Sequence, residues 1–317
     1  MNRPERDFVT HLPFTDPDWT AGGERRAHVG LSALRTLWFN TGTLCNITCA
    51  NCYIHSSPTN DALIYLTLEE VARFLREIHE RGLPTTEIGF TGGEPFMNPE
   101  IIEMAEAALR AGHRVLILTN AMQPMMRPAM QAGLQRLAAE FGDRLVLRVS
   151  LDHHTATHHD ALRGDGSFER TLTGMRWLRD NGIAMAVAGR TIWGENEAET
   201  RAGFAALFAA EGFAIDAGDP AQCVLFPEMD EAAEVPEITE SCWAILGKSP
   251  EEVMCASSRM VVRRKGSARA TVLSCTLLAY DPAFELGSTL AEAERPVALN
   301  HRHCAKFCVL GGASCSG

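Results

Sequence analysis

The stretch Leu44-Cys45-Asn46-Ile47-Thr48-Cys49-Ala50-Asn51-Cys52-Tyr53 holds three cysteines at the spacing C-x3-C-x2-C, with an aromatic residue directly after the third. Such close spacing lets three thiolates converge from one loop onto one face of a metal cluster. Cysteine thiolates are the usual ligands of [4Fe–4S] clusters, and four of them normally complete the ligand shell. A loop that supplies three leaves one iron with an open position, where a small molecule can bind.

Zinc is the alternative metal for this loop. Cysteine also binds Zn²⁺ in tetrahedral sites, and His55 is close enough in sequence to act as a fourth ligand. The loop alone therefore leaves a zinc knuckle open, and other parts of the chain must decide between the two metals.

Composition narrows the class of protein. The 317 residues carry 29 basic and 40 acidic side chains, for a net charge of −11, which argues against a nucleic-acid groove or an anionic membrane as main partner. Residues 1–30 are polar, and no apolar run is long enough to span a bilayer. We therefore expect a cytoplasmic protein, in which ten cysteines indicate metal ligands before disulfides.

From residue 35 onward, short apolar runs alternate with amphipathic segments, which predicts strand–helix units with a parallel sheet. One helix start is well marked, because Thr67 and Glu70 form a capping box and Gly82 follows the helix. Asn98 is expected to cap the next helix, with Pro99 at its first position. The expected strands are 35–40, 87–91, 114–119, 144–150, 184–191 and 223–226, and the expected helices are 67–81, 99–112, 128–141, 167–181 and 197–211.

Polar residues stand at the ends of these strands, where sites in parallel α/β folds lie. The turn Gly92-Gly93-Glu94 follows the second strand; two glycines let the backbone approach a ligand closely, and Glu94 is an acceptor for an ammonium group. Asn120 and Ser150 end the third and fourth strands, and Arg190 lies late in the fifth, where its guanidinium suits a carboxylate. Each of these residues has a plain alternative role, which is to satisfy the loop backbone.

Together these motifs resemble the radical S-adenosylmethionine (SAM) enzymes. Cys45, Cys49, Cys52 and Tyr53 match the family signature, and Gly92-Gly93-Glu94 matches its Gly-Gly-Glu element. The resemblance implies a partial (β/α)6 barrel over residues 35–226, a [4Fe–4S] cluster on the three cysteines, and SAM bound at its open iron. It further implies that Tyr53, Gly92, Gly93, Glu94, Asn120, Ser150 and Arg190 contact SAM, and that reduced flavodoxin or ferredoxin supplies the electron.

Four histidines crowd the segment after Ser150, together with Asp160 and Arg163. Such a group can bind a separate metal. Loops of this kind more often face substrate or solvent without a metal, and we favour that interpretation. The pairs His159-Asp160 and Arg163-Gly164 also match elements common in the resembled family.

The C-terminal part carries a second group of cysteines. Two apolar runs around a basic turn near Lys265 predict a β-hairpin with Cys255 and Cys275 at its ends, and Cys304, Cys308 and Cys315 follow. This resembles the SPASM/twitch extensions of radical SAM enzymes, and the cysteine count suits one auxiliary [4Fe–4S] cluster. Its expected ligands are Cys255, Cys275, Cys304 and Cys308, with Cys315 as rival for the last place and zinc as the alternative metal.

The expected organisation is a lead-in over residues 1–34 that packs on the barrel, the barrel over 35–226, a linker over 227–253 and the auxiliary domain over 254–317. We expect a 5′-deoxyadenosyl radical that abstracts hydrogen from a small molecule, with Cys223 as a weak candidate for a hydrogen-atom donor. A peptide maturase is the chief alternative; the short lead-in, compared with a leader-binding domain, favours a small molecule. A non-catalytic Fe–S scaffold or electron carrier and a zinc-structured interaction protein are the rivals outside enzymes.

Overall fold

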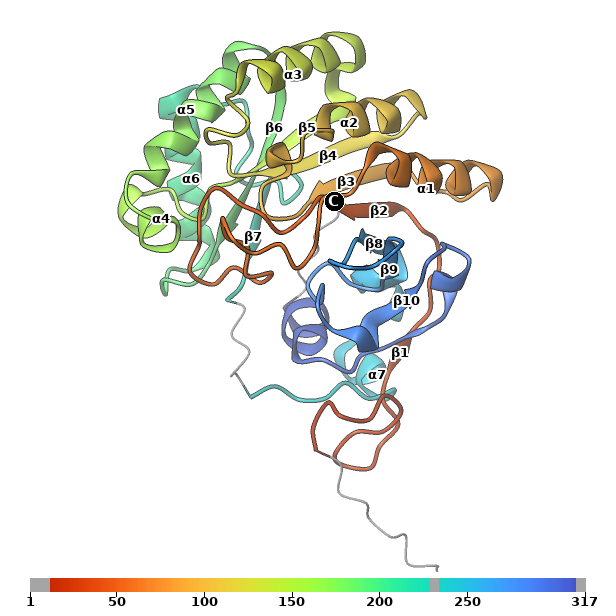
Figure 1. Cartoon of the computed structure of the whole chain (residues 1–317). Coiled ribbons are helices and arrows are strands. Elements are labelled where there is room, and N and C mark those ends of the chain that lie inside the picture. The colour runs from red at the N-terminus through yellow and green to blue at the C-terminus, as the bar shows by residue number, and fades with distance from the viewer. Residues whose placement is uncertain (1–11, 229–233, 312–317) are drawn as a thin grey trace, which may run out of the picture.

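The centre of the computed structural model is a nine-stranded sheet in the order β10-β9-β8-β2-β3-β4-β5-β6-β7; residues 12–228 and 234–311 are described (Figure 1). The six strands from β2 to β7 are parallel, as the alternating pattern predicts. Their bounds are β2 (Thr36–Asn40), β3 (Glu87–Thr91), β4 (Arg114–Thr119), β5 (Leu145–Ser150), β6 (Ala184–Arg190) and β7 (Cys223–Phe226). The predicted α/β partial barrel is therefore confirmed.

Six helices connect these strands and lie along the outer side of the sheet (Figure 1). The capping box at Thr67 is present, with the Glu70 amide donating to the Thr67 hydroxyl and the Glu70 carboxylate accepting from the Thr67 amide. The bounds are α1 (Leu68–Glu80), α2 (Ile101–Arg110), α3 (Pro128–Phe141), α4 (Ala156–Arg163), α5 (Ser167–Asp180) and α6 (Glu197–Glu211). None of the described helices is long and apolar enough to cross a membrane.

Two details of the helices differ from the expectation. Glu100, and not Asn98, is the N-cap residue of α2, which begins at Ile101. The Asn98 oxygen accepts from the Glu100 amide at 3.0 Å, and its amide nitrogen donates to the carbonyls of Thr41 and Leu66. Asn98 therefore bonds to segments on both sides of the Cys loop, at Thr41 and Leu66, and the spacing of residues in the sequence does not reveal these contacts. The His-rich segment after β5 is only partly a loop: His153 and His154 precede α4, and His158 and His159 lie in it.

The sheet separates two apolar layers. Phe39 packs between Phe90 and Phe74 on the helix side, with ring centroids 5.7 and 6.0 Å apart. Trp38 points to the opposite, inner side and packs with Leu116 and Met260. Successive residues of β2 therefore serve different layers, as the period of two in a strand requires.

The predicted C-terminal hairpin is present as β8 (Ser258–Val262) and β9 (Thr271–Leu273), which pair antiparallel. β8 also pairs in parallel with β2, so the hairpin and β10 (Glu285–Gly287) continue the barrel sheet. The other elements of this part are α7 (Cys242–Leu246), β11 (Val297–Ala298) and a π-helix at Cys304–Leu310, with 3₁₀ turns at Pro95–Met97, Gly142–Arg144, Pro250–Glu252, Met254–Ala256, Pro282–Phe284 and Glu292–Glu294.

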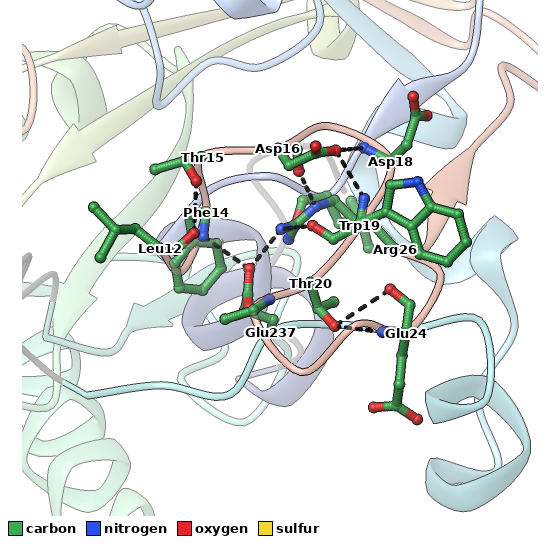
Figure 2. Close-up of polar contacts among 12 residues, drawn as sticks. Leu12, Phe14, Thr15, Asp16, Asp18, Trp19, Thr20, Glu24, Arg26 and Glu237 are labelled. Carbon is green, nitrogen blue, oxygen red and sulfur yellow. Dashed lines mark hydrogen bonds and ion pairs between the residues drawn. The ribbon is translucent and has the colours of Figure 1, made fainter. Parts of the chain in front are cut away.

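The N-terminal segment packs on the C-terminal part, which corrects the expected packing on the barrel. β1 (His28–Val29) pairs antiparallel with β11, and the Ala27 amide donates to the Ile238 carbonyl at 2.9 Å. Figure 2 shows the buried Arg26 guanidinium at the centre of this contact, where it donates to the carbonyls of Asp16 and Trp19 and pairs with Glu237. One buried cation thus joins segments more than 200 residues apart in sequence.

Candidate active site

The three cysteines of the signature face one cavity at the carboxyl ends of the parallel strands. Tyr53 lines the same cavity of about 150 Å³. The loop is held by its own backbone: the Cys45 amide donates to the Ser57 carbonyl at 3.0 Å, and the Ala50 amide donates to the Leu162 carbonyl in α4 at 2.8 Å. The predicted convergence of Cys45, Cys49 and Cys52 is therefore present in the folded chain.

The electrostatics of these thiols call for a cation among them. Burial raises the pKa of Cys45 to about 12 and also raises the pKa of Cys49, because a thiolate loses its hydration there. Bound iron offsets that cost, since metal coordination deprotonates a thiol. Three soft sulfur donors in a half-open cavity fit a cluster that keeps one coordination position for a small ligand.

The Gly92-Gly93 turn holds the Cys loop closely. A Cβ at Gly93 would lie 2.3 Å from the Leu44 carbonyl oxygen, and a Cβ at Gly92 would lie 2.5 Å from the Gly42 oxygen. The amides of Gly93 and Glu94 donate to the carbonyls of Gly42 and Leu44 at 2.8 and 3.1 Å. The close backbone approach that the sequence predicted thus serves the loop that carries Cys45, while both glycines also line the cavity.

Glu94 lies behind this turn and is not among the residues that line the cavity. Its buried carboxylate accepts from the Thr119 hydroxyl at 2.9 Å and the Phe96 amide at 3.2 Å through Oε1, and from the Asn120 amide at 2.8 Å through Oε2. Burial raises its pKa to about 7 despite these bonds. The Glu94 carboxylate therefore connects the end of β3 to the end of β4. Its Oε2 accepts one hydrogen bond, from the Asn120 amide.

Asn120 and Ser150 both line the cavity from the ends of β4 and β5. The Asn120 side chain is fixed at both ends, since its amide nitrogen donates to Asn46 Oδ1 at 2.9 Å and its oxygen accepts from the Met122 amide at 3.0 Å. This links β4 to the Cys loop one residue after Cys45. Ser150 has half-buried surface available to a ligand.

A buried ion-pair group forms part of the cavity wall. Arg163 from α4 contacts Asp152 with two nitrogens, at 2.6 and 3.1 Å, and Arg190 Nε contacts the same carboxylate at 3.2 Å. Burial would raise the pKa of Asp152, but the two guanidinium charges outweigh it and lower the pKa to about 2. Arg190 thus contacts Asp152 through Nε and is itself among the residues that line the cavity.

Sequence reasoning missed the role of this ion-pair group. Arg163 appeared there only as part of a crowded segment, yet the structure brings it into the cavity beside Cys49. Asp160, its neighbour in that segment, instead holds the start of α5, accepting from the Phe168 amide at 2.7 Å and the Ser167 hydroxyl at 2.9 Å. Helical spacing was the signal that could have revealed this role. Asp160, which holds the start of α5, and Arg163, which lines the cavity, lie about one turn apart on α4.

A second, smaller cavity of about 20 Å³ lies in the C-terminal part. Cys255, Cys275, Cys304 and Cys308 all line it, together with His303. Burial raises the pKa of Cys304 well above its usual value, and the nearby thiols of Cys275 and Cys255 raise it further. Four clustered sulfur donors fit a fully ligated metal cluster or a zinc ion equally well. Cys315 lies outside the described residues.

The two cavities share one wall. Leu277 lines both of them, and Phe307 lines the larger one directly before Cys308. The Leu277 amide lies 3.3 Å from Cys275 Sγ, and the Phe307 ring packs on Phe226 with centroids 5.6 Å apart. The C-terminal part therefore closes the larger cavity with apolar side chains.

Cys223 does not reach either cavity. It is the first residue of β7 and not the last, it is fully buried in the helix-side core, and burial raises its pKa to about 11. The end of β7 that lines the cavity is Phe226. The expectation that Cys223 donates a hydrogen atom is therefore wrong, because Cys223 is a buried core residue.

Comparison with known proteins identifies the class that this fold and site define. The radical SAM superfamily matches residues 39–202, about half of the chain, and the chain belongs to that superfamily. It is accordingly a radical SAM enzyme, with SAM and a [4Fe–4S] cluster as cofactors.

The similar proteins act on different kinds of substrate. The chain is 31% identical over 154 residues to the subtilosin biosynthesis protein AlbA of Bacillus subtilis strain 168, covering 47% of this chain and 32% of AlbA. It is 35% identical over 139 residues to the AdoMet-dependent heme synthase of Methanosarcina barkeri, covering 43% and 36%. The chain spans only about a third of the length of these relatives.

Solved structures share the fold. The enzyme anSMEcpe with bound AdoMet superposes with a TM-score of 0.58 at 14% identity, covering 86% of this chain and 82% of that one. Streptococcus suis SuiB bound to S-adenosylmethionine superposes with a TM-score of 0.57 at 11% identity, covering 81% and 63%. At these identities the likeness concerns the fold alone.

Proposed function

We propose that this radical SAM enzyme abstracts a hydrogen atom from a small-molecule substrate and uses one auxiliary [4Fe–4S] cluster, either to take an electron from the substrate radical or to anchor the substrate. The observation that carries the proposal is the pair of cysteine-lined cavities that share Leu277 as a wall. The cofactors supply an electron that cleaves SAM to a 5′-deoxyadenosyl radical and, at the second cavity, an electron acceptor. The chain itself must bind, orient and shield the reactants.

Three groups of residues would bind the cofactors. Cys45, Cys49 and Cys52 would hold the catalytic cluster, and Cys255, Cys275, Cys304 and Cys308 the auxiliary one. Gly92, Gly93, Asn120 and Ser150 line the cavity where SAM would lie, with Tyr53 at the Cys loop. Arg190 lines the cavity and its guanidinium suits the SAM carboxylate, and Glu94, behind the glycine turn, is the proposed acceptor for the SAM ammonium group.

The walls divide the cavity by polarity. Asp152, Arg163 and Arg190 form a charged side, and Phe226, Leu277 and Phe307 form an apolar side next to the auxiliary cysteines. The apolar side excludes water from the place where a substrate radical would be oxidised, and its bulk favours a compact substrate over an extended chain. A pure electron carrier would need neither the cavity nor its charged wall.

Iron content and SAM cleavage test this proposal. Anaerobic reconstitution should give close to eight irons per chain, and dithionite with SAM should yield 5′-deoxyadenosine. Cys45→Ala should abolish that product, whereas Cys275→Ala should lose about half of the iron and retain some cleavage. If the wild-type protein binds only four irons, the auxiliary cluster is absent. If Cys275→Ala also stops SAM cleavage, the separate roles proposed for the two clusters are wrong.

Peptide modification is the second candidate, because AlbA is a bacteriocin biosynthesis protein and a mycofactocin maturase of Mycobacterium tuberculosis is 28% identical over 155 residues. Size-fractionated extract of the source cells separates the two. Stimulation of 5′-deoxyadenosine formation by the low-mass fraction alone supports a small molecule, and stimulation that a peptidase abolishes supports a peptide.

A further inference from the structure

Three potential metal ligands converge outside the SAM cavity. His153 and His154 follow β5, and Glu195 precedes α6 after β6. One ligand atom from each residue lies within 4.8 Å of the others, and His153 Nε2 is 3.1 Å from Glu195 Oε2. His153 is 1% exposed, whereas His154 and Glu195 are half-buried, so the group lies at the edge of the fold with one ligand fully inside it.

The polar contacts of this group are incomplete. His154 Nδ1 is buried and has no hydrogen-bond partner among the described residues. Most buried polar atoms in native proteins are satisfied, and an exception calls for a bound ion or water. An imidazole nitrogen beside a second imidazole and a carboxylate is the donor arrangement that transition metals use.

The two imidazoles are held in place by their surroundings. The His154 ring lies against the backbone of α6 at Gly203, where a Cβ would be 2.3 Å from the ring, and it stacks on His153 with centroids 4.0 Å apart. Thr155 Oγ1 lies 2.9 Å from His153 Nδ1 and can accept the proton that Nδ1 carries when Nε2 binds a metal. Without metal the Thr155 amide donates to the same Nδ1, so Nε2 carries the ring proton and faces Glu195. Zinc on Nε2 would move that proton to Nδ1, and the Thr155 amide would give up its bond to this nitrogen.

We propose that His153, His154 and Glu195 bind one zinc ion that is separate from both iron–sulfur sites. Two imidazoles and one carboxylate leave the fourth tetrahedral position to water. Zinc is favoured over Fe²⁺ because nitrogen and oxygen donors bind it more strongly in the Irving–Williams order. The ion would join the segment that follows Asp152 to the segment that follows Arg190, and so fix both sides of the charged wall of the SAM cavity.

Zinc stoichiometry tests the site with both clusters in place, so that the cysteines are already occupied. Anaerobically reconstituted protein is incubated with zinc sulfate, gel-filtered, and analysed for zinc and iron. We expect one zinc per chain with iron unchanged, and a melting temperature several degrees higher than without zinc. His154→Ala and Glu195→Gln should each reduce zinc at least tenfold at the same free zinc concentration.

Matched variants exclude general effects. His158→Ala, at the neighbouring ring, and Glu197→Gln, on the exposed start of α6, should retain one zinc per chain. The proposal is overturned if wild-type protein binds no zinc, if zinc enters only as iron leaves, or if His154→Ala and Glu195→Gln bind zinc as well as the wild type. If those two variants do not fold, the wild-type stoichiometry and zinc-dependent melting still decide.

Discussion

Replacing Asp152 with Asn removes the one carboxylate shared by two guanidinium groups in the active-site wall. Asp152 is 3% exposed, and it accepts two bonds from Arg163 and one from Arg190. The substitution keeps the size of the side chain, so its effect reports the lost charge. We expect a less stable protein with a displaced Arg190 and weaker SAM binding.

The magnitude follows from the pKa of Asp152. That pKa is about 2 in the folded protein, against about 3.9 in an unfolded chain. At about 1.4 kcal/mol per pH unit, the charged carboxylate contributes roughly 2.5 kcal/mol to the free energy of unfolding at neutral pH. Because the folded pKa is depressed, this contribution is present above about pH 4 and disappears as the pH falls through about 2. Removing one partner of a buried ion pair typically costs about 3–5 kcal/mol. We therefore expect Asp152→Asn to lower the free energy of unfolding by about 3 kcal/mol at neutral pH.

Thermal unfolding of the cluster-loaded protein under anaerobic conditions measures this effect. A chain of this size loses about 2 °C of melting temperature per kcal/mol, so Asp152→Asn should melt roughly 6 °C lower at pH 7. Asp165→Asn, at an exposed position near the start of α5, is the matched control and should melt with the wild type. Adding Arg163→Met to Asp152→Asn should recover part of the loss, since the unpaired cation is gone. A single variant that melts within about 2 °C of the wild type would refute the reasoning.

Three further predictions concern neighbouring parts of the site. Gly93→Ala should prevent the catalytic cluster from assembling and leave about half of the iron, because its Cβ would lie 2.3 Å from the Leu44 oxygen; Gly30→Ala, with open space around it, should bind iron normally. Because the folded pKa of Glu94 is raised to about 7, the wild type without SAM should lose about 3 kcal/mol of stability as the pH rises from about 4.5 to 7. Glu94→Gln should not show this loss, so the stability difference should shift toward the variant by about that amount between pH 5 and pH 8, and an unchanged difference in melting temperature would contradict this. Leu277→Ala should lower stability by about 2–5 kcal/mol and shift the auxiliary reduction potential in a redox titration, because water enters between the cavities, whereas Leu277→Met should leave that potential unchanged.

Features with a local cause were predicted well. The capping box at Thr67, the parallel strands and the hairpin between β8 and β9 follow from neighbouring residues and from apolar periodicity. The expected helix cap at Asn98 is wrong by two residues, because the helix begins only at Ile101; the Asn98 oxygen accepts from the Glu100 amide before the helix starts. The expected strand at 223–226 is present, but Cys223 stands at its start and is fully buried in the core, away from the strand end that lines the cavity.

The sequence by itself indicated the class of this protein, because the C-x3-C-x2-C loop and the Gly-Gly-Glu turn follow neighbouring strands and together match one family. It also determined the parallel barrel, since hydrophobic period and turn residues act over short distances. Only the tertiary structure decided which groups share a wall: that Arg163 and Arg190 meet on Asp152, that Leu277 separates two cysteine-lined cavities, and that Arg26 ties the N-terminal segment to the C-terminal part. Those contacts join residues that are distant in the chain, and burial gives them energies that no local pattern encodes.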